Sequence, residues 1–337
     1  MDEIIIKSGK IQGISDIHIH SERPLSMRIN GSIVQDHEQV ISATDVNEFI
    51  KNKLSNEQSE HLEQHKGVDL ALVIGDIRFR VNIYSASNGF NIVMRKIETH
   101  VPDFYTLNFP PVIESKINAL SGLILVTGPT GSGKSTSLAA MINHINQKKE
   151  ANIITVEDPI EFLHTPNKCL ISQRELGANT PTFSHALRES LREDPDVILV
   201  GELRDLETTQ LALTAAETGH LVFGTLHTSG ASNTITRIID IFPPGQQDQV
   251  RAQLATSLKL VITQRLLKKS DGSGRVAAFE VLVSNAAVQN LIRENKIFQI
   301  ASTMQTGIGD GMVQMERSIE ELLETGLVTQ DEVDNAH

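Results

Sequence analysis

The sequence predicts an α/β protein of two domains, in which a small N-terminal α+β domain precedes a larger domain built on a mostly parallel sheet with a helical C-terminal tail. Short segments of alternating apolar and polar residues dominate the first part of the chain, whereas uninterrupted apolar segments alternate with amphipathic helices in the second. Between them, residues 98–111 contain three prolines that interrupt both periodicities. We therefore expect domains at residues 1–105 and 106–337.

The first domain is predicted from three alternating segments and one polar helical stretch. The segments "DIHIHS" (16–21), "LSMRI" (25–29) and "IRFRVNIY" (77–84) alternate with period two, which is typical of half-buried antiparallel strands. Residues 43–65, "ATDVNEFIKNKLSNEQSEHLEQH", lack this alternation and predict helix. Together they indicate a small α+β domain.

The second domain is predicted from four apolar runs. Together with the polar residues at their ends, these runs occupy residues 122–128, 152–158, 196–202 and 220–227, and amphipathic helices separate them. Strands that are buried on both faces and alternate with helices are typical of parallel sheets. The ligands of such sheets bind at the carboxyl ends of the strands, so the residues that follow these runs are the candidates for a site.

The first of these runs leads into the segment "GPTGSGKST", residues 128–136. The segment matches GxxxxGK[ST], and the strand before it and the helix after it are the context in which that pattern binds nucleotide phosphates. Glycines in the loop allow successive N–H groups to point at the phosphates, and the helix N-terminus adds its positive end. We expect Lys134 to contact the β- and γ-phosphates of ATP and Ser135 to bind Mg²⁺. The predicted nucleotide-binding set is Thr130, Gly131, Ser132, Gly133, Lys134, Ser135 and Thr136.

Polar residues also follow the other three runs. Glu202 follows "DVILVG" and is predicted to join Ser135 in binding Mg²⁺, while Glu161 follows "NIITVEDPI" and is the candidate general base. His227 follows "LVFGTL" and could hydrogen-bond the γ-phosphate. Each residue alone could be a solvated strand end, and only their convergence at one sheet edge favours catalysis. His220 precedes the same strand, so we expect a structural or subunit-interface role for it.

Composition restricts the class of partner. The net charge of −12, the absence of Trp and the presence of only two Tyr argue against nucleic acid as the main partner. The single cysteine, Cys169, excludes an intramolecular disulfide and a Cys-rich zinc cluster. The N-terminus does not resemble a signal peptide, and no apolar run reaches the ~20 residues of a membrane span. We therefore expect a cytoplasmic protein.

Four motifs resemble, in order and spacing, those of the type II/IV secretion ATPase superfamily. "GPTGSGKST", "ITVEDPIEF", "DPDVILVGELRD" and "TGHLVFGTLHT" are similar to its Walker A, Asp box, Walker B and His box, and residues 15–33 and 78–82 resemble its N-terminal PAS-like domain. The resemblance implies a RecA-like ATPase domain, a homo-hexamer that uses ATP and Mg²⁺, and an inner-membrane platform protein as partner. It places the ring at the inner face of the cytoplasmic membrane, associated with it only through partners.

Within the superfamily the chain is most similar to the motors of pilus retraction, which drive twitching motility. It has only a short N-terminal domain and one cysteine, whereas longer members add a recruitment domain and often a four-cysteine element. Its tail "AVQNLIRENK" carries Gln289 where the retraction motors have arginine. A paralogous accessory or assembly ATPase of a type IV pilus or type II secretion system therefore stays open as an alternative.

The resemblance also implies that Arg80 and Arg95 of the first domain reach the nucleotide when that domain folds over its own or a neighbouring subunit's phosphates. The alternative is that both only pair with acidic groups on their own sheet. Two other classes of function are weighed against a motor. A nucleic-acid translocase is disfavoured by the acidic balance, and a non-hydrolysing switch by the two acidic clusters at the strand ends.

Overall fold

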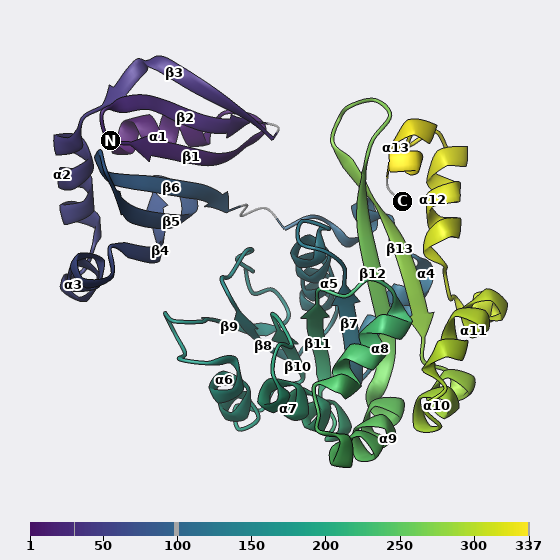
Figure 1. Ribbon diagram of the computed structural model, residues 1–337. Helices are drawn as coiled ribbons and strands as arrows, with labels where there is room; N and C mark the ends of the chain where they lie inside the picture. Colours follow the sequence, from purple (N-terminus) through teal and green to yellow (C-terminus); the bar gives the residue numbers. More distant parts are fainter. Residues whose placement is uncertain (30, 98–100, 336–337) are drawn as a thin grey trace. The chain divides into compact units, whose positions relative to one another are not determined.

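The computed structural model describes residues 1–29, 31–97 and 101–335, which form two compact units, Met1–Thr99 and His100–His337 (Figure 1). The division falls a few residues before the predicted boundary at residue 105. Residues 98–100, which begin the predicted break, lie outside the described residues. Among the described residues, no helix is both long enough and apolar enough to cross a bilayer.

The first unit is a six-stranded antiparallel sheet in the order β3-β2-β1-β6-β5-β4, with three helices packed on it. One face of the sheet is apolar and forms the core with α1 and α2, as the alternating segments predicted. The elements are α1 (Asp2–Gly9), β1 (Ile14–His20), β2 (Arg23–Ile29), β3 (Ser32–Ile41), α2 (Ala43–Lys53), α3 (Asn56–His65), β4 (Gly67–Ile74), β5 (Ile77–Ala86) and β6 (Gly89–Ile97).

The stretch predicted as helical over residues 43–65 is confirmed, and the structure divides it into two helices. Helix α2 ends at Lys53, and Leu54 is extended (φ −88°, ψ 144°). The hydroxyl of Ser55 accepts a hydrogen bond from the N–H of Gln58, and the Gln58 side chain accepts one from the N–H of Ser55. This reciprocal capping box starts a new helix at Asn56, because it satisfies N–H groups that have no partner within the helix.

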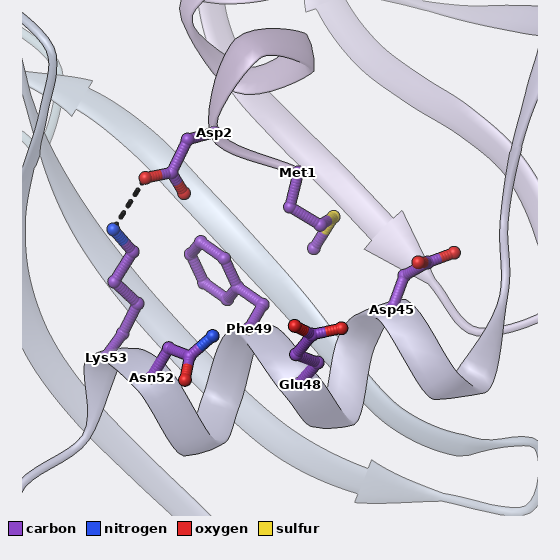
Figure 2. A pocket seen from close by; sticks show the side chains of 7 residues that line it. All are labelled: Met1, Asp2, Asp45, Glu48, Phe49, Asn52 and Lys53. Carbon is purple, nitrogen blue, oxygen red and sulfur yellow. Dashed lines mark hydrogen bonds and ion pairs between the residues drawn. The ribbon is translucent and has the colours of Figure 1, made fainter.

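A small pocket of about 260 Å³ lies between the start of α1 and helix α2 (Figure 2). The ammonium of Lys53 donates to Oδ2 of Asp2 at 2.7 Å and lies 5.7 Å from the centre of the Phe49 ring. The ion pair and the cation–π contact therefore tie the first turn of α1 to α2. The lining residues are Met1, Asp2, Asp45, Glu48, Phe49, Asn52 and Lys53.

The second unit contains a seven-stranded sheet in the order β13-β12-β7-β11-β10-β8-β9. All neighbouring strands pair in parallel except β12 and β13, which are antiparallel, so the predicted mostly parallel sheet is confirmed. The strands are β7 (Gly122–Thr127), β8 (Asn152–Glu157), β9 (Leu170–Glu175), β10 (Val197–Val200), β11 (Leu221–Leu226), β12 (Leu258–Lys268) and β13 (Arg275–Val283).

Helices surround this sheet and complete its core. Strands β7, β10 and β11 are buried along their whole length, which explains why their sequences show no alternation. The helices that connect the strands are α4 (Pro111–Ile117), α5 (Lys134–Lys148), α6 (Phe183–Ser190), α7 (Leu206–Glu217), α8 (Ala231–Asp240) and α9 (Gln247–Ser257). Short 3-10 turns at Phe104–Leu107 and Pro244–Gln246 precede α4 and α9.

The C-terminal tail is helical, as predicted, and follows β13 in the order α10 (Ala286–Arg293), α11 (Ile300–Thr306), α12 (Met315–Glu324) and α13 (Gln330–Asn335). Helix α12 packs on β13 (Figure 1). Its buried residues Met315 and Ile319 form a second small core with Val276 and Ala278 of β13. The tail is therefore an integral part of the unit rather than an appendage.

Candidate active site

The phosphate loop connects the buried strand β7 to helix α5. Gly131 and Gly133 have φ angles of +79° and +89°, as expected for a loop that curls its backbone N–H groups inward. Gly128 has φ +139°, and a Cβ atom there would lie 2.4 Å from the carbonyl oxygen of Gln264. The first residue of the loop therefore has to be glycine for both conformational and steric reasons.

The start of α5 has the features of an anion site. Its N-cap residue is Gly133, whose position provides no side-chain hydrogen bond to the first turn. The hydroxyl oxygen of Ser132 is buried, and no described group hydrogen-bonds to it. Unsatisfied donors at a helix N-terminus fit a phosphate group. Ser135 lies in the same first turn of α5, where a hydroxyl would bind the Mg²⁺ that accompanies a triphosphate.

The Lys134 ammonium folds back onto the loop. It donates to the carbonyl oxygens of Gly128 at 2.8 Å and Pro129 at 3.0 Å, and lies 3.5 Å from Nδ1 of His227. Burial lowers the pKa of Lys134, and the negative charges of Glu202 and Glu161 oppose that shift. Lys134 therefore contacts the loop directly and also interacts electrostatically with Glu202 and Glu161, the acidic residues predicted to act with it.

Glu202 is the centre of a charged cluster at the end of β10. Its Oε2 accepts from Arg204 at 2.7 Å and lies 3.3 Å from Nε2 of His227. Burial alone would raise the pKa of the Glu202 carboxyl, but the hydrogen bonds and charges of Arg204 and His227 more than offset it and hold the pKa below its usual value. The carboxylate is therefore ionised at neutral pH, as an Mg²⁺ ligand has to be.

Strand pairing explains why Glu202 and His227 meet. Strands β10 and β11 are parallel neighbours, and Val200 lies opposite Gly224. Beyond the end of β10, the Thr225 hydroxyl of β11 donates to the Gly201 carbonyl oxygen, and the N–H of Leu203 donates to the Thr225 carbonyl oxygen at 3.0 Å. The predicted convergence of Lys134, Glu202 and His227 at one sheet edge is confirmed, while their catalytic roles stay predictions.

Glu157 is the last residue of β8 and Glu161 follows it, and the two carboxyl groups have different environments. Oε1 of Glu157 accepts from Thr155 at 2.7 Å and from Gln173 at 3.2 Å. Burial raises the pKa of the Glu157 carboxyl, although these two hydrogen bonds lower it in part. Glu161 is exposed, and its charge acts on both Glu157 and Lys134. The assignment of the base to Glu161 stays a prediction.

His220 lies at the opposite end of β11 from this cluster. Its Nδ1 is 2.9 Å from the carbonyl oxygen of Ala215 and 3.3 Å from the Thr218 hydroxyl. These contacts hold the last turn of α7 next to the start of β11, which agrees with the structural role that we expected.

Arg80 and Arg95 belong to the first unit, where they lie side by side. They are directly opposite one another on β5 and β6. Nε of Arg95 donates to Oδ1 of the buried Asp16 at 2.8 Å, and the Arg95 side chain stays 70% exposed. The expected alternative, pairing with an acid on the same sheet, therefore holds for Arg95. Whether either arginine also reaches a nucleotide stays a prediction.

The sequence interpretation missed several polar residues around the loop. A cavity of about 250 Å³ lies between residues 129–132 and β12 with β13, and Arg265 and Arg275 add positive charge to its wall. Glu280 was also missed, although a single carboxylate inside the apolar strand "RVAAFEVLV" is a visible signal. Arg204 was not assigned a role from the sequence, because its pairing with Glu202 depends on the turn after β10.

Comparison with known proteins gives a consistent result. Residues 3–273 match the family described as "Type II/IV secretion system protein". The chain is 49% identical over 303 residues to a "Twitching motility protein" of Neisseria gonorrhoeae, covering 90% of this chain and 81% of that protein. It is 44% identical over 330 residues to the "Type IV pilus retractation ATPase PilT" of Pseudomonas aeruginosa, covering 98% and 95%. A crystal structure of the pilus retraction motor PilT with bound ADP matches with a TM-score of 0.93 and 44% identity, covering 100% and 96%.

Proposed function

The chain belongs to the type II/IV secretion system protein family, and from this premise we propose that it is a ring-forming motor that retracts a type IV pilus. It is a P-loop ATPase that converts ATP to ADP and phosphate. The motor assignment is supported above all by the extent of the similarity. A protein named for pilus retraction aligns with 98% of this chain, so the similarity includes the first unit and the helical tail as well as the phosphate loop.

The proposal includes the finer architecture. Residues 1–105 are assigned to a PAS-like domain, and residues 106–337 to a RecA-like ATPase domain with its tail. Six copies form the ring, which works at the cytoplasmic face of the inner membrane and is held there by a platform protein. The acidic balance of the chain suits a protein partner better than nucleic acid.

The proposed mechanism assigns a separate task to each group at the sheet edge. The N–H groups of residues 130–136 and Lys134 would bind the phosphates, and Ser135 and Glu202 would hold Mg²⁺, which would supply positive charge to the transferred phosphoryl group. Glu161 orients the attacking water. His227 already contacts Lys134 and Glu202, so it can respond when the γ-phosphate leaves. Its motion would pass to α8, which begins four residues later.

A count of surface pili tests the direction of work. Cells that lack this chain are expected to carry an excess of pili that do not retract and to lose twitching motility. A complementing Lys134→Ala chain should give the same phenotype, because it keeps the protein present while removing turnover. Cells without any pili would indicate an assembly motor instead.

The alternative of an accessory ATPase is favoured by one residue, Gln289 in α10, which replaces the arginine of the retraction motors. If this residue limits retraction, Gln289→Arg should increase twitching speed without a matching rise in the ATPase rate of the purified protein. An unchanged pilus count after deletion, with twitching intact, would support the accessory role and contradict the proposal.

We further propose that the active site is shared between subunits. Arg80 and Arg95 would reach the nucleotide as the first domain closes, and their charge would stabilise the spread negative charge of the transition state. Such closure also couples hydrolysis to domain movement. The exposure of the Arg95 side chain, despite its bond to Asp16, is compatible with a change of partner.

Mixing two inactive variants tests this sharing. Arg80→Ala/Arg95→Ala chains are combined with Lys134→Ala chains, and the ATPase rate of the mixed rings is measured. In a random equal mixture about one junction in four pairs an intact phosphate loop with intact arginines, so activity should partly return. Arg23→Ala, an exposed arginine on β2, serves as the matched control for a lost surface charge. No recovery despite demonstrated co-assembly would show that the arginines do not act across the junction.

A further inference from the structure

A row of polar side chains crosses the sheet beside the phosphate loop, on strands that are otherwise mainly apolar. Thr127 of β7 lies opposite Thr263 of β12, and Thr263 lies opposite Glu280 of β13. Side chains that are directly opposite in neighbouring strands project from the same face of the sheet. The two threonine hydroxyl oxygens are 3.0 Å apart, and the Thr263 hydroxyl lies beside the Glu280 carboxyl, whose pKa it lowers as a hydrogen-bond donor.

The chemistry of these groups determines which of them donates each hydrogen bond. A threonine hydroxyl has one proton to donate, and an ionised carboxylate can only accept. When Glu280 is ionised, Thr263 therefore donates to Glu280 and accepts from Thr127. Thr127 and Thr263 are only 0% and 4% exposed, so water does not readily replace either bond. The row thus begins at the residue that directly precedes Gly128, the first residue of the phosphate loop.

The other end of the row is the start of helix α8. Oε1 of Glu280 accepts a hydrogen bond from the N–H of Ala231, the first residue of that helix, at 2.7 Å. The N-cap residue Gly230 has φ +87°, a conformation that strains residues with a side chain, so a local Ser or Asp cap is not readily accommodated. Glu280 supplies the missing cap from the sheet, where its negative charge also suits the helix N-terminus.

Helix α8 directly follows residues 227–230, which we name the histidine loop. The loop is bound to the first turn of α8: the Thr228 and Thr234 hydroxyl oxygens are 2.7 Å apart, and the Asn233 amide donates to the Ser229 carbonyl oxygen at 2.9 Å. A contact that fixes the start of α8 therefore also fixes the histidine loop. At the front of that loop, His227 lies against Lys134 and Glu202.

Burial of Glu280 disfavours the charged form of its carboxyl group. Burial raises the pKa of the Glu280 carboxyl, the Ala231 bond lowers it, and the nearby Glu316 raises it again. A partly buried acid is stabilised only when its hydrogen bonds are made, so the position of the carboxylate is closely linked to both of its donors.

We propose that Glu280 is a positioning residue for ATP hydrolysis, which holds the histidine loop through Ala231 and the start of the phosphate loop through Thr263 and Thr127. This inference depends on the proposed role of His227 and is independent of pilus retraction. Glu280 would keep the His227 imidazole within reach of Lys134 and Glu202. This matters because a displacement of about 1 Å in such a site can lower the rate of hydrolysis by roughly 10²-fold.

Two substitutions at position 280 separate the hydrogen bonds from the charge. Glu280→Gln keeps an oxygen for the Ala231 N–H and can donate to Thr263, so kcat should stay within about threefold of the parent. Glu280→Met keeps the length of the side chain but removes both bonds, so kcat should fall by about 10- to 100-fold while KM for ATP changes little. Glu316→Gln, which removes a nearby exposed carboxylate outside the row, is the matched control.

A double-mutant cycle with His227→Ala distinguishes positioning from general stability. If Glu280 acts through His227, Glu280→Met should lower kcat little further in the His227→Ala background. The melting temperature of each variant is measured in parallel. Thr263→Val, which removes one hydroxyl and leaves the Ala231 bond in place, provides a second cycle if Glu280→Met folds poorly.

The outcomes are distinguishable. Strong coupling between either substitution and His227→Ala, with activity preserved in Glu280→Gln, supports the inference. Additive losses, or a rise in KM with an unchanged kcat, would overturn it and leave the proposed role of His227 in place. An active His227→Ala variant would overturn the role of His227 itself, together with this inference, while leaving the pilus assignment standing.

Discussion

The ATPase rate of a Lys134→Ala variant is expected to be at least about 10³-fold lower than that of the parent chain. Loss of a single preorganised hydrogen-bond donor to developing charge typically costs 10²- to 10³-fold, and Lys134 adds a full positive charge to that donor. At about 1.4 kcal/mol for each factor of ten, the loss corresponds to roughly 4 kcal/mol of transition-state stabilisation. Lys134→Arg should restore little, because a planar guanidinium does not replace a compact ammonium in a loop.

The structure adds a second consequence to this substitution. The Lys134 ammonium donates to two loop carbonyl oxygens at 2.8 and 3.0 Å. These carbonyls belong to residues 128 and 129, so the lysine also stabilises the conformation of the loop. ATP affinity should therefore fall as well, which equilibrium binding of a fluorescent ATP analogue would measure.

Lys148→Ala is the matched control, since Lys148 is an exposed lysine at the last residue of the same helix. It should hydrolyse ATP at the parental rate. Turnover of Lys134→Ala within about tenfold of the parent would contradict the assignment of residues 128–136 as the phosphate loop, whatever the melting temperature of the variant.

The parts of this site that could be predicted from the sequence are those in which local pattern and chemistry coincide. The loop residues 128–136 follow a strand and open a helix, and each acidic candidate lies within a few residues of the end of a strand. Parallel pairing then brings the ends of these runs to one edge, because a parallel sheet has its carboxyl ends on one side. Lys134, Glu202 and His227 could be placed together on this basis alone.

The remaining contacts depend on pairings between distant segments, for which the sequence has no local signal. Thr127 and Thr263 are 136 residues apart, and Glu280 is 49 residues from Ala231. Only the position of β12 and β13 beside β7 brings these groups together. By contrast, the break between α2 and α3 has a local signal in the sequence. Ser55 and Gln58 have the spacing of a capping box, and this pattern was overlooked within a stretch of mostly polar residues.

The second large effect is expected for Glu202→Gln, which should lower the ATPase rate by about 10²- to 10³-fold while leaving the affinity for ATP within a few-fold of the parent. The amide keeps the shape of the side chain and one acceptor oxygen for Arg204 or His227. It loses the negative charge that Arg204 and His227 stabilise in the resting site and that Mg²⁺ would require in the loaded one. Binding is largely preserved because the loop and Lys134 still hold the phosphates.

A titration with Mg²⁺ separates the proposed metal ligand from the proposed base. Glu202→Gln should need a higher Mg²⁺ concentration for half-maximal rate, whereas Glu161→Gln should lose rate at an unchanged Mg²⁺ requirement. Glu207→Gln is the matched control, since Glu207 is an exposed carboxylate on the following helix whose partner is Arg188. If Glu202→Gln hydrolysed ATP normally, Glu157 would have to replace it as the metal-side carboxylate. If Glu161→Gln shifted the Mg²⁺ requirement and Glu202→Gln did not, the two assignments would have to be exchanged.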